Sequence, residues 1–320
     1  MDSEDSMLER NEKRIMEETK TSSVVMTTYN GTEYVIQQLE SLRSQTLAPL
    51  EVIIADDGST DATVDVINEY ISKNGLSNWY VIRNNVNKGW RRNFVEAAAL
   101  AKGKYIFFCD QDDIWVKDKI QVMVSAMENN KQINVLAGRY IKFQNEIPEF
   151  EISGNEVHLV KEDNHLLFTD FPGCVYCVRR TFWEEIIQFW NGVFSHDAIC
   201  WAAAKLQKSA YILERPVIYW RRHYDSTYTV TSRKLKNRET RIEWLKTAQE
   251  NIECLKKISA ALKLDSLATA KISKYSEFNK LRIEMLDKHK IVNAFKLIGR
   301  IDCYNKKKQL LLEIYLSFKK

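Results

Sequence analysis

The first third of the chain alternates short apolar runs with segments of helical periodicity. Apolar residues such as Val35, Leu39 and Leu42 recur at three- and four-residue spacing, which predicts amphipathic helices. The runs between these helices are rich in β-branched and aromatic residues, as buried strands are, and they cover residues 22–29, 50–55, 79–83 and 104–109. Parallel strands need crossover connections, so the alternation predicts an α/β fold with a mostly parallel sheet flanked by helices.

Beyond Val116 the pattern becomes less regular. A helix is expected to about Asn129 and a strand over residues 133–143, followed by a polar stretch to Asn164. From Arg241 onward, apolar residues again hold a helical spacing. We therefore predict three parts: a charged leader over residues 1–20, an α/β body over residues 21–230, and a helical C-terminal extension over residues 231–320.

Composition excludes several classes of protein. With 45% apolar and 28% charged residues among 320, the chain can bury a sizeable core. No two of its ten glycines stand at G-x-G spacing, which excludes both the Rossmann dinucleotide fingerprint and the Walker A loop. No apolar run reaches the roughly 18 residues of a membrane span, and the first twenty residues are charged throughout. These features predict a cytoplasmic protein.

The charge is concentrated at the end of the chain. Residues 288–320 hold nine Lys or Arg and two acidic residues, a balance of 9 − 2 = +7, so the rest of the chain carries 4 − 7 = −3. A mildly acidic body with a basic tail argues against a nucleic-acid partner and for one localised anionic contact. Two interpretations of the tail stay open with equal weight: packing on the body, or peripheral contact with the inner face of the plasma membrane.

The six cysteines predict neither a disulfide scaffold nor a zinc site. They are few and scattered for a chain of this length, and the Cys174–Cys177 pair has no second pair or nearby His to complete a zinc set. We interpret them as structural thiols.

Candidate chemistry lies after the predicted strands, where α/β sheets bind their ligands. Asp110, Asp112 and Asp113 directly follow the fourth run, and three carboxylates this close repel one another unless a cation or strong donors compensate. Oxygen ligands favour Mg²⁺ or Mn²⁺; the alternative is a solvated acidic loop. Asp57 follows the second run, and we expect it to form a hydrogen-bonding pocket with the residues after the first run, Thr27, Tyr29 and Asn30.

Four segments in this order resemble the N-terminal block of inverting family 2 glycosyltransferases with the GT-A fold. They are MTTYNGTEYVIQQLESLRSQT, LEVIIADDGSTDAT, NVNKGWRRNF and GKYIFFCDQDDIW, and they cover residues 22–115 with the intervening chain. The resemblance implies a nucleotide-sugar donor and a divalent cation, Mn²⁺ or Mg²⁺. It implies nucleobase contacts from Thr27, Tyr29 and Asp57, a place for Asp110 by the ribose and the metal, and metal binding by Asp112. Residues of the third segment would flank the nucleotide: Asn87, Gly89 and Arg92.

Later segments extend the resemblance. Residues 171–174 are similar to the family's acceptor loop, and Asp197, in a Ser-His-Asp segment, stands where the family has its general base. Residues 219–224 resemble the Y-R-x-H segment, which implies that Arg221 and Arg222 neutralise phosphate and that His223 completes the metal shell. Arg222 and Tyr224 replace the commoner Gln and Gly there, which puts the flexibility of this loop in doubt.

We therefore expect a metal-dependent inverting glycosyltransferase. The Q-x-x-R-W signature of processive synthases is absent, which implies transfer of one sugar per encounter. The DQDDIW form with the Y-R-x-H segment resembles bacterial rhamnosyltransferases of surface polysaccharide synthesis, so dTDP-L-rhamnose is the first donor hypothesis, and a growing glycan or a lipid-linked sugar is the acceptor. The alternatives are a UDP-hexose or UDP-N-acetylhexosamine transferase, or a binding module without catalysis. A nucleotidyltransferase is disfavoured because the first strand end offers a single glycine.

Overall fold

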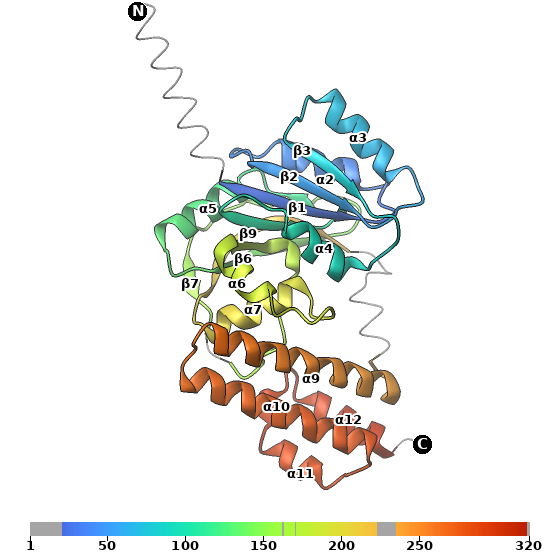
Figure 1. Cartoon of the computed structure of the whole chain (residues 1–320), viewed down its shortest axis with the longest axis vertical. Coiled ribbons are helices and arrows are strands. Elements are labelled where there is room, and N and C mark those ends of the chain that lie inside the picture. Colours follow the sequence, from blue (N-terminus) through green and yellow to red (C-terminus); the bar gives the residue numbers. More distant parts are fainter. Residues whose placement is uncertain (1–20, 162, 170, 223–234, 319–320) are drawn as a thin grey trace, which may run out of the picture. The chain divides into compact units, whose positions relative to one another are not determined.

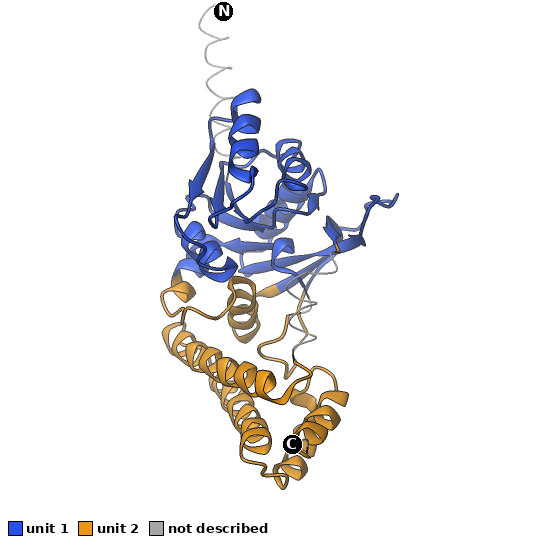
Figure 2. Cartoon of the chain, turned by 90° about the vertical axis from the view of Figure 1, so that its right-hand side faces the viewer, with its two compact units in different colours: residues 1–158, 171–184, 211–221 blue, residues 159–170, 185–210, 222–320 orange. Residues whose placement is uncertain are grey.

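A computed structural model describes residues 21–161, 163–169, 171–222 and 235–318 (Figure 1). The chain divides into two compact units, coloured separately in Figure 2. The first unit contains residues up to 158, 171–184 and 211–221, and the second contains residues 159–170, 185–210 and the chain from 222 onward. The domain boundaries predicted at residues 20 and 230 divide the chain differently from these two units, and they stay a prediction.

The first unit is built on a mixed sheet whose strand order is β3-β2-β1-β4-β8-β6-β9-β5, with β7 paired to β9. Strands β1 to β4 are parallel, whereas β8 pairs antiparallel with β4 and with β6, and β5 pairs antiparallel with β9. The strands are β1 (Ser22–Thr28), β2 (Glu51–Asp56), β3 (Trp79–Arg83), β4 (Tyr105–Cys109), β5 (Ile114–Trp115), β6 (Val135–Phe143), β7 (Val157–Leu159), β8 (Tyr176–Arg179) and β9 (Ala210–Arg221).

The central strands are apolar because helices cover them. In β1, Val24, Val25 and Met26 are fully buried, and burial of such a side chain contributes about 1.5–3 kcal/mol. The helices packed around the sheet are α2 (Val35–Arg43), α3 (Thr63–Lys73), α4 (Trp90–Ala98) and α5 (Lys119–Asn129), as Figure 1 shows. The predicted α/β class and the alternation of strands and helices are confirmed.

Close packing of β6 against β9 depends on a glycine. A Cβ atom on Gly138 would lie 2.4 Å from a methyl carbon of Val217, well inside contact distance. The strand predicted over residues 133–143 is therefore an interior strand of the sheet, and the absence of a side chain at Gly138 lets its neighbour approach.

The second unit is helical. Its helices include α7 (His196–Leu206), α9 (Arg238–Ala261), α10 (Ser266–Asp287), α11 (Asn293–Ile298) and α12 (Lys308–Phe318), with short 3₁₀ turn η2 (Ile301–Cys303); helix α6 (Arg180–Ile187) continues into it from the first unit. Helices α9 and α10 lie side by side, and the short connection between them fits an antiparallel pair (Figure 1). The helical C-terminal region is thus present as expected. Among the described residues, no helix combines the length and apolar content needed to cross a membrane.

A buried ionic cluster joins three of these helices. Glu313 of α12 is fully buried and accepts hydrogen bonds from Arg241 Nε of α9 at 2.8 Å and Arg282 Nη2 of α10 at 2.5 Å. The Tyr304 hydroxyl donates to the same carboxylate at 2.8 Å. Burial raises the pKa of Glu313, but the two guanidinium groups outweigh burial and lower it below its ordinary value. Next to this cluster, Leu316 packs into the apolar core of the three helices.

All six cysteines lie in described parts of the chain, and all are buried and free of disulfides. Their burial fits the interpretation that they are structural thiols.

Candidate functional site

The carboxyl ends of β1, β2, β3 and β4 lie at one edge of the sheet, and the polar residues that follow them are joined by backbone hydrogen bonds. Asp57 N donates to Thr28 O at 2.8 Å, and Asn84 N donates to Asp56 O at 2.8 Å. Because the strands are parallel, the polar segments that follow them lie at one edge of the sheet, where α/β folds bind ligands.

Asp56 holds the turn after β2. Its carboxylate is fully buried and accepts from Gly58 N at 3.1 Å and Ser59 N at 2.8 Å, while the Thr28 hydroxyl donates to it at 2.9 Å. Gly58 has φ +80°, a conformation that side chains rarely adopt. The first of the two adjacent aspartates is thus a structural anchor for the second.

Asp57 organises the turn after β3. Its side chain is buried, and its Oδ1 accepts from Asn84 Nδ2 at 3.1 Å and Lys88 N at 2.8 Å, while Oδ2 accepts from Gly89 N at 2.9 Å. Gly89 has φ +84° and precedes α4 directly. A carboxylate has about four acceptor positions, so three donors leave room for one more. The predicted nucleobase contact of Asp57 stays a prediction beside this structural role.

The other residues of the predicted nucleotide-flanking turn are exposed. Asn87 Oδ1 accepts from Gly89 N at 3.0 Å. Arg92 lies on the first turns of α4 and makes an ion pair with Glu96 at 3.0 Å, and Glu96 also pairs with Lys88 at 2.6 Å. Two cations therefore share one carboxylate beside the turn, which leaves net positive charge there.

Thr27 and Tyr29 occupy opposite kinds of position at the end of β1. Thr27 is buried in the strand, whereas Tyr29 is 46% exposed. The Tyr29 backbone is held on both sides by Gln111, whose Oε1 accepts from Tyr29 N at 2.8 Å and whose Nε2 donates to Tyr29 O at 3.1 Å. Asn30, at φ +49°, accepts from Thr60 N through its Oδ1 at 2.9 Å.

Gln111 has a positioning role that sequence reasoning missed. It lies between the aspartates of the acidic loop and ties that loop to the end of β1. A Cβ atom on Gly31 would lie 2.3 Å from Gln111 Oε1, so the glycine leaves space for this side chain. The sequence offers one weak signal for this contact: an amide side chain, Gln111, stands within the acidic motif, and a glycine, Gly31, follows the first strand.

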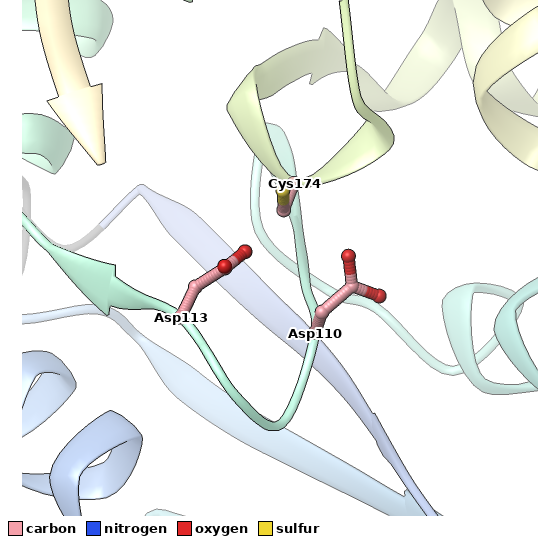
Figure 3. Close-up of side chains that lie close together, drawn as sticks. All are labelled: Asp110, Asp113 and Cys174. Atoms are coloured by element: carbon pink, nitrogen blue, oxygen red, sulfur yellow. The ribbon is translucent and has the colours of Figure 1, made fainter. Parts of the chain in front are cut away.

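The acidic loop brings Asp110 and Asp113 together beside Cys174 (Figure 3). Asp110 follows β4, Asp113 precedes β5, and Cys174 lies in the 3₁₀ turn η1 (Gly173–Val175). One ligand atom from each residue lies within 4.8 Å of the others. Burial, together with the charges of Asp112 and Asp110, raises the pKa of Asp113 well above its usual range.

The donor set tests whether a divalent cation fits. The two carboxylates offer the oxygen ligands that Mg²⁺ and Mn²⁺ prefer. Burial and the neighbouring carboxylates raise the pKa of the Cys174 thiol, so it is a neutral neighbour and not a ligand for these ions. Asp112, the predicted principal ligand, lies between Asp110 and Asp113 in the sequence, is partly exposed, and is not a member of the three-residue cluster.

Arg221 fixes the acidic loop. Its backbone N donates to Asp113 Oδ1 at 3.0 Å and its Nε donates to the Asp112 carbonyl at 2.8 Å. The guanidinium lies 4.8 Å from the centroid of the Tyr34 ring and 4.4 Å from that of Phe143. The predicted phosphate contact of Arg221 stays a prediction, and the structure adds a positioning role at the end of β9.

Lys119 is a second residue that the sequence did not reveal. It is fully buried, its Nζ donates to the Cys174 carbonyl at 2.6 Å, and it lies 3.4 Å from the centroid of the Trp115 ring. Burial lowers its pKa to about 8. The ammonium group thereby ties α5 to the turn that carries Cys174.

The second unit carries the predicted base. Asp197 lies in the first turn of α7, partly exposed, where the helix dipole favours the anionic form. His196 beside it is buried, and burial lowers its pKa to about 4. Arg222, also partly exposed, belongs to this unit. His223, the predicted third metal ligand, lies outside the described residues.

Comparisons with known proteins identify a family and a set of relatives. A model of glycosyl transferase family 2 matches residues 23–184. The chain is 38% identical over 120 residues to an Escherichia coli protein named UDP-Glc:alpha-D-GlcNAc-diphosphoundecaprenol beta-1,3-glucosyltransferase WfaP, a match that covers 38% of this chain and 46% of WfaP, less than half its length. It is 29% identical over 220 residues to dTDP-rhamnosyl transferase RfbG of Shigella flexneri, covering 62% of this chain and 71% of RfbG.

Solved structures show the same fold. The structure of S. aureus TarS residues 1–349 in complex with UDP superposes with a TM-score of 0.54 at 18% identity, covering 93% of this chain and 90% of that one. The complex of the same protein with UDP-GlcNAc gives a TM-score of 0.52 at 16% identity, covering 89% and 93%. The likeness supports a GT-A fold.

Proposed function

The chain belongs to glycosyl transferase family 2, and we propose that it moves one sugar from a nucleotide-sugar donor to a growing cell-surface glycan or lipid-linked acceptor, with inversion at the anomeric carbon. One observation carries the proposal. The acidic loop with Asp110 and Asp113 is locked at the carboxyl end of β4 by Arg221 and Gln111, at the same edge of the sheet as the turn that Asp57 organises. A phosphate-bearing ligand placed there would meet a turn flanked by Lys88 and Arg92, and a divalent cation held by the carboxylates would offset their repulsion of the phosphates.

The proposed donor is dTDP-L-rhamnose. It is supported by RfbG, whose name states dTDP-rhamnosyl transfer and whose match extends over 62% of this chain. The alternative donors are UDP-hexoses and UDP-N-acetylhexosamines, supported by the name of WfaP and by the ligands of TarS.

As the resemblance implies, Asp110 and Asp112, with His223, would hold a Mn²⁺ or Mg²⁺ ion, and Asp113, which lies beside Asp110, would support them from the buried side of the loop. When bound, the cation supplies positive charge to the diphosphate leaving group. Thr27, Tyr29, Asn30 and Asp57 would bind the nucleotide. Asn87, Gly89, Arg92, Arg221 and Arg222 would surround its phosphates.

We assign the general base to Asp197. A carboxylate at the start of α7 is favoured as an anion, so it is ready to take a proton from an acceptor hydroxyl. The hydroxyl oxygen then attacks the anomeric carbon, the glycosidic bond to the diphosphate breaks, and the nucleoside diphosphate leaves in a single displacement.

A panel of nucleotide sugars with Mn²⁺ present tests the proposal. We expect one donor to be hydrolysed slowly without acceptor and to raise the melting temperature, because ligand binding to the folded state stabilises it. Stabilisation by a donor without hydrolysis or transfer under any acceptor would instead favour a catalytically inactive binding module. No response to any nucleotide sugar would refute both.

A further inference from the structure

Strongly exposed apolar side chains are concentrated in one part of the second unit. Among the described residues, large apolar side chains more than 55% exposed occur at only two places outside it, Val86 at 67% and Leu267 at 57%. Six others, from 57% to 76% exposed, lie on α11, on α12 or directly before α11: Val292, Phe295, Ile298, Leu311, Tyr315 and Phe318. We call these six residues the tail face.

The orientation of α12 is fixed by what it buries. Glu313 is held by Arg241 and Arg282, and Leu316 packs in the core of α9, α10 and α12. These contacts use one side of the helix. Leu311, Tyr315 and Phe318 stand at positions i, i+4 and i+7, which share the other side. The buried ion cluster therefore holds α12 with an apolar stripe facing outward. Rotation of the helix to bury this stripe would break two ion pairs.

Positive charge accompanies the tail face. Lys288 and Lys296 stand before and within α11, Lys306 and Lys307 precede α12, and Lys308 begins it. None of these five makes a salt bridge with a described residue, whereas Arg300 pairs with Glu277 at 2.7 Å. A second copy of this chain would bring lysines against lysines. An anionic partner with an apolar interior complements both the charge and the exposed side chains.

We propose that the tail face docks on an anionic phospholipid bilayer, with its apolar side chains in the interfacial region and the lysines at the headgroups. Interfacial helices combine an apolar side with lysines in this way. The proposal combines the two interpretations of the tail, because α12 packs on its own unit with one side and would offer the other to a lipid surface. It does not depend on the proposed transfer reaction.

Vesicle flotation of the full chain tests the proposal without donor or acceptor. We expect flotation with vesicles of phosphatidylcholine and phosphatidylglycerol at low salt, weaker flotation at high salt, and little with phosphatidylcholine alone. The triple variant Lys306→Gln, Lys307→Gln, Lys308→Gln should lower the partition coefficient roughly 10²-fold, since each lysine near an anionic surface contributes about a factor of five.

The apolar contribution has a matched control. Ile298→Ser should weaken flotation by roughly tenfold, as expected for an apolar side chain that leaves water. Leu267→Ser, at the same 57% exposure but on α10, should leave flotation unchanged. Thermal melting by circular dichroism checks that each variant is folded. If the Ile298→Ser variant does not fold, the triple lysine variant still tests the proposal.

Three results would overturn the proposal. These are no flotation of the unaltered chain at low salt, equal loss in Ile298→Ser and Leu267→Ser, or a stable dimer in light scattering that floats with no vesicle. The last result would assign the tail face to a second copy. Failure of sugar transfer would leave the flotation result unchanged, so the two proposals fail separately.

Discussion

Replacing Asp57 by asparagine separates the structural role of this residue from its proposed contact with the nucleobase. The carboxylate accepts from Asn84 Nδ2, Lys88 N and Gly89 N at 2.8–3.1 Å in a buried position. Asparagine keeps one oxygen, so the amide nitrogen would face a backbone N–H in place of an acceptor. The change alters one atom and adds almost no volume.

The cost follows from these three bonds. A hydrogen bond to a charged group contributes about 1.5–3 kcal/mol, and one such bond is lost. The two remaining bonds lose their charge assistance, worth about 1 kcal/mol together. Gly89 N keeps Asn87 Oδ1 at 3.0 Å, which limits the penalty. We therefore expect Asp57→Asn to lower the free energy of unfolding by about 3 kcal/mol.

Urea unfolding measures this loss. With an m-value of about 2–3 kcal/mol/M, the midpoint should fall by about 1 to 1.5 M. Amide exchange at Lys88 and Gly89 should quicken, and affinity for UDP or dTDP should fall. Asp65→Asn, an exposed acid on the neighbouring α3, is the control and should change stability by less than about 0.5 kcal/mol. An unaltered midpoint and unaltered exchange at the two amides would refute the turn-organising role, even if nucleotide affinity fell.

Three further outcomes are expected. Asp112→Ala should abolish turnover and metal-dependent donor binding without unfolding the chain, because it removes one carboxylate from a mutually repelling set; full activity of this variant, or of the unaltered enzyme in EDTA, contradicts the metal assignment. Asp197→Asn should lower kcat by roughly 10²- to 10⁴-fold with donor affinity nearly unchanged; an equal loss of donor binding would reassign it to the donor. Glu313→Gln should destabilise the second unit by about 3–5 kcal/mol in urea unfolding, because two buried guanidinium groups lose their charge partner. Since the pKa of Glu313 is lowered from 4.5 in the folded chain, the unaltered protein should lose this stabilisation as the pH falls below 4.5, and Glu313→Gln should not show that step.

Local patterns were sufficient for the parallel half of the sheet. The run over residues 79–83 coincides with β3, and the run over residues 22–29 differs from β1 by one residue. Every side chain of β1 is buried, whereas the edge strand β3 is mostly half-buried, yet both runs are rich in β-branched and aromatic residues, and this local signal predicts a strand in either setting. The antiparallel half was less predictable. Strand β8 pairs with β4 although about 70 residues separate them, and no local signal encodes such a pairing.

The site shows the same division. The aspartates after β2 and β4 could be selected because carboxylates after buried strands are unusual. Lys119 and Glu313 could not, since charged residues in helical patterns are normally solvated and only the folded chain shows their buried partners. The anchoring contacts of Arg221 with the acidic loop link residues more than 100 positions apart. The expected ligand contacts of the aspartates and of Arg221 stay predictions, which the nucleotide-sugar and mutation assays above test.

The burial of every thiol has a practical consequence for spectroscopy. Burial raises the pKa of each cysteine and shields it, so maleimide reagents should label the native chain slowly. One cysteine introduced at an exposed position then accepts a fluorophore against a silent background. Leu311→Cys, on the outward side of α12, would report the polarity around that helix as vesicles are added, and Leu267→Cys would report the aqueous reference from the same unit.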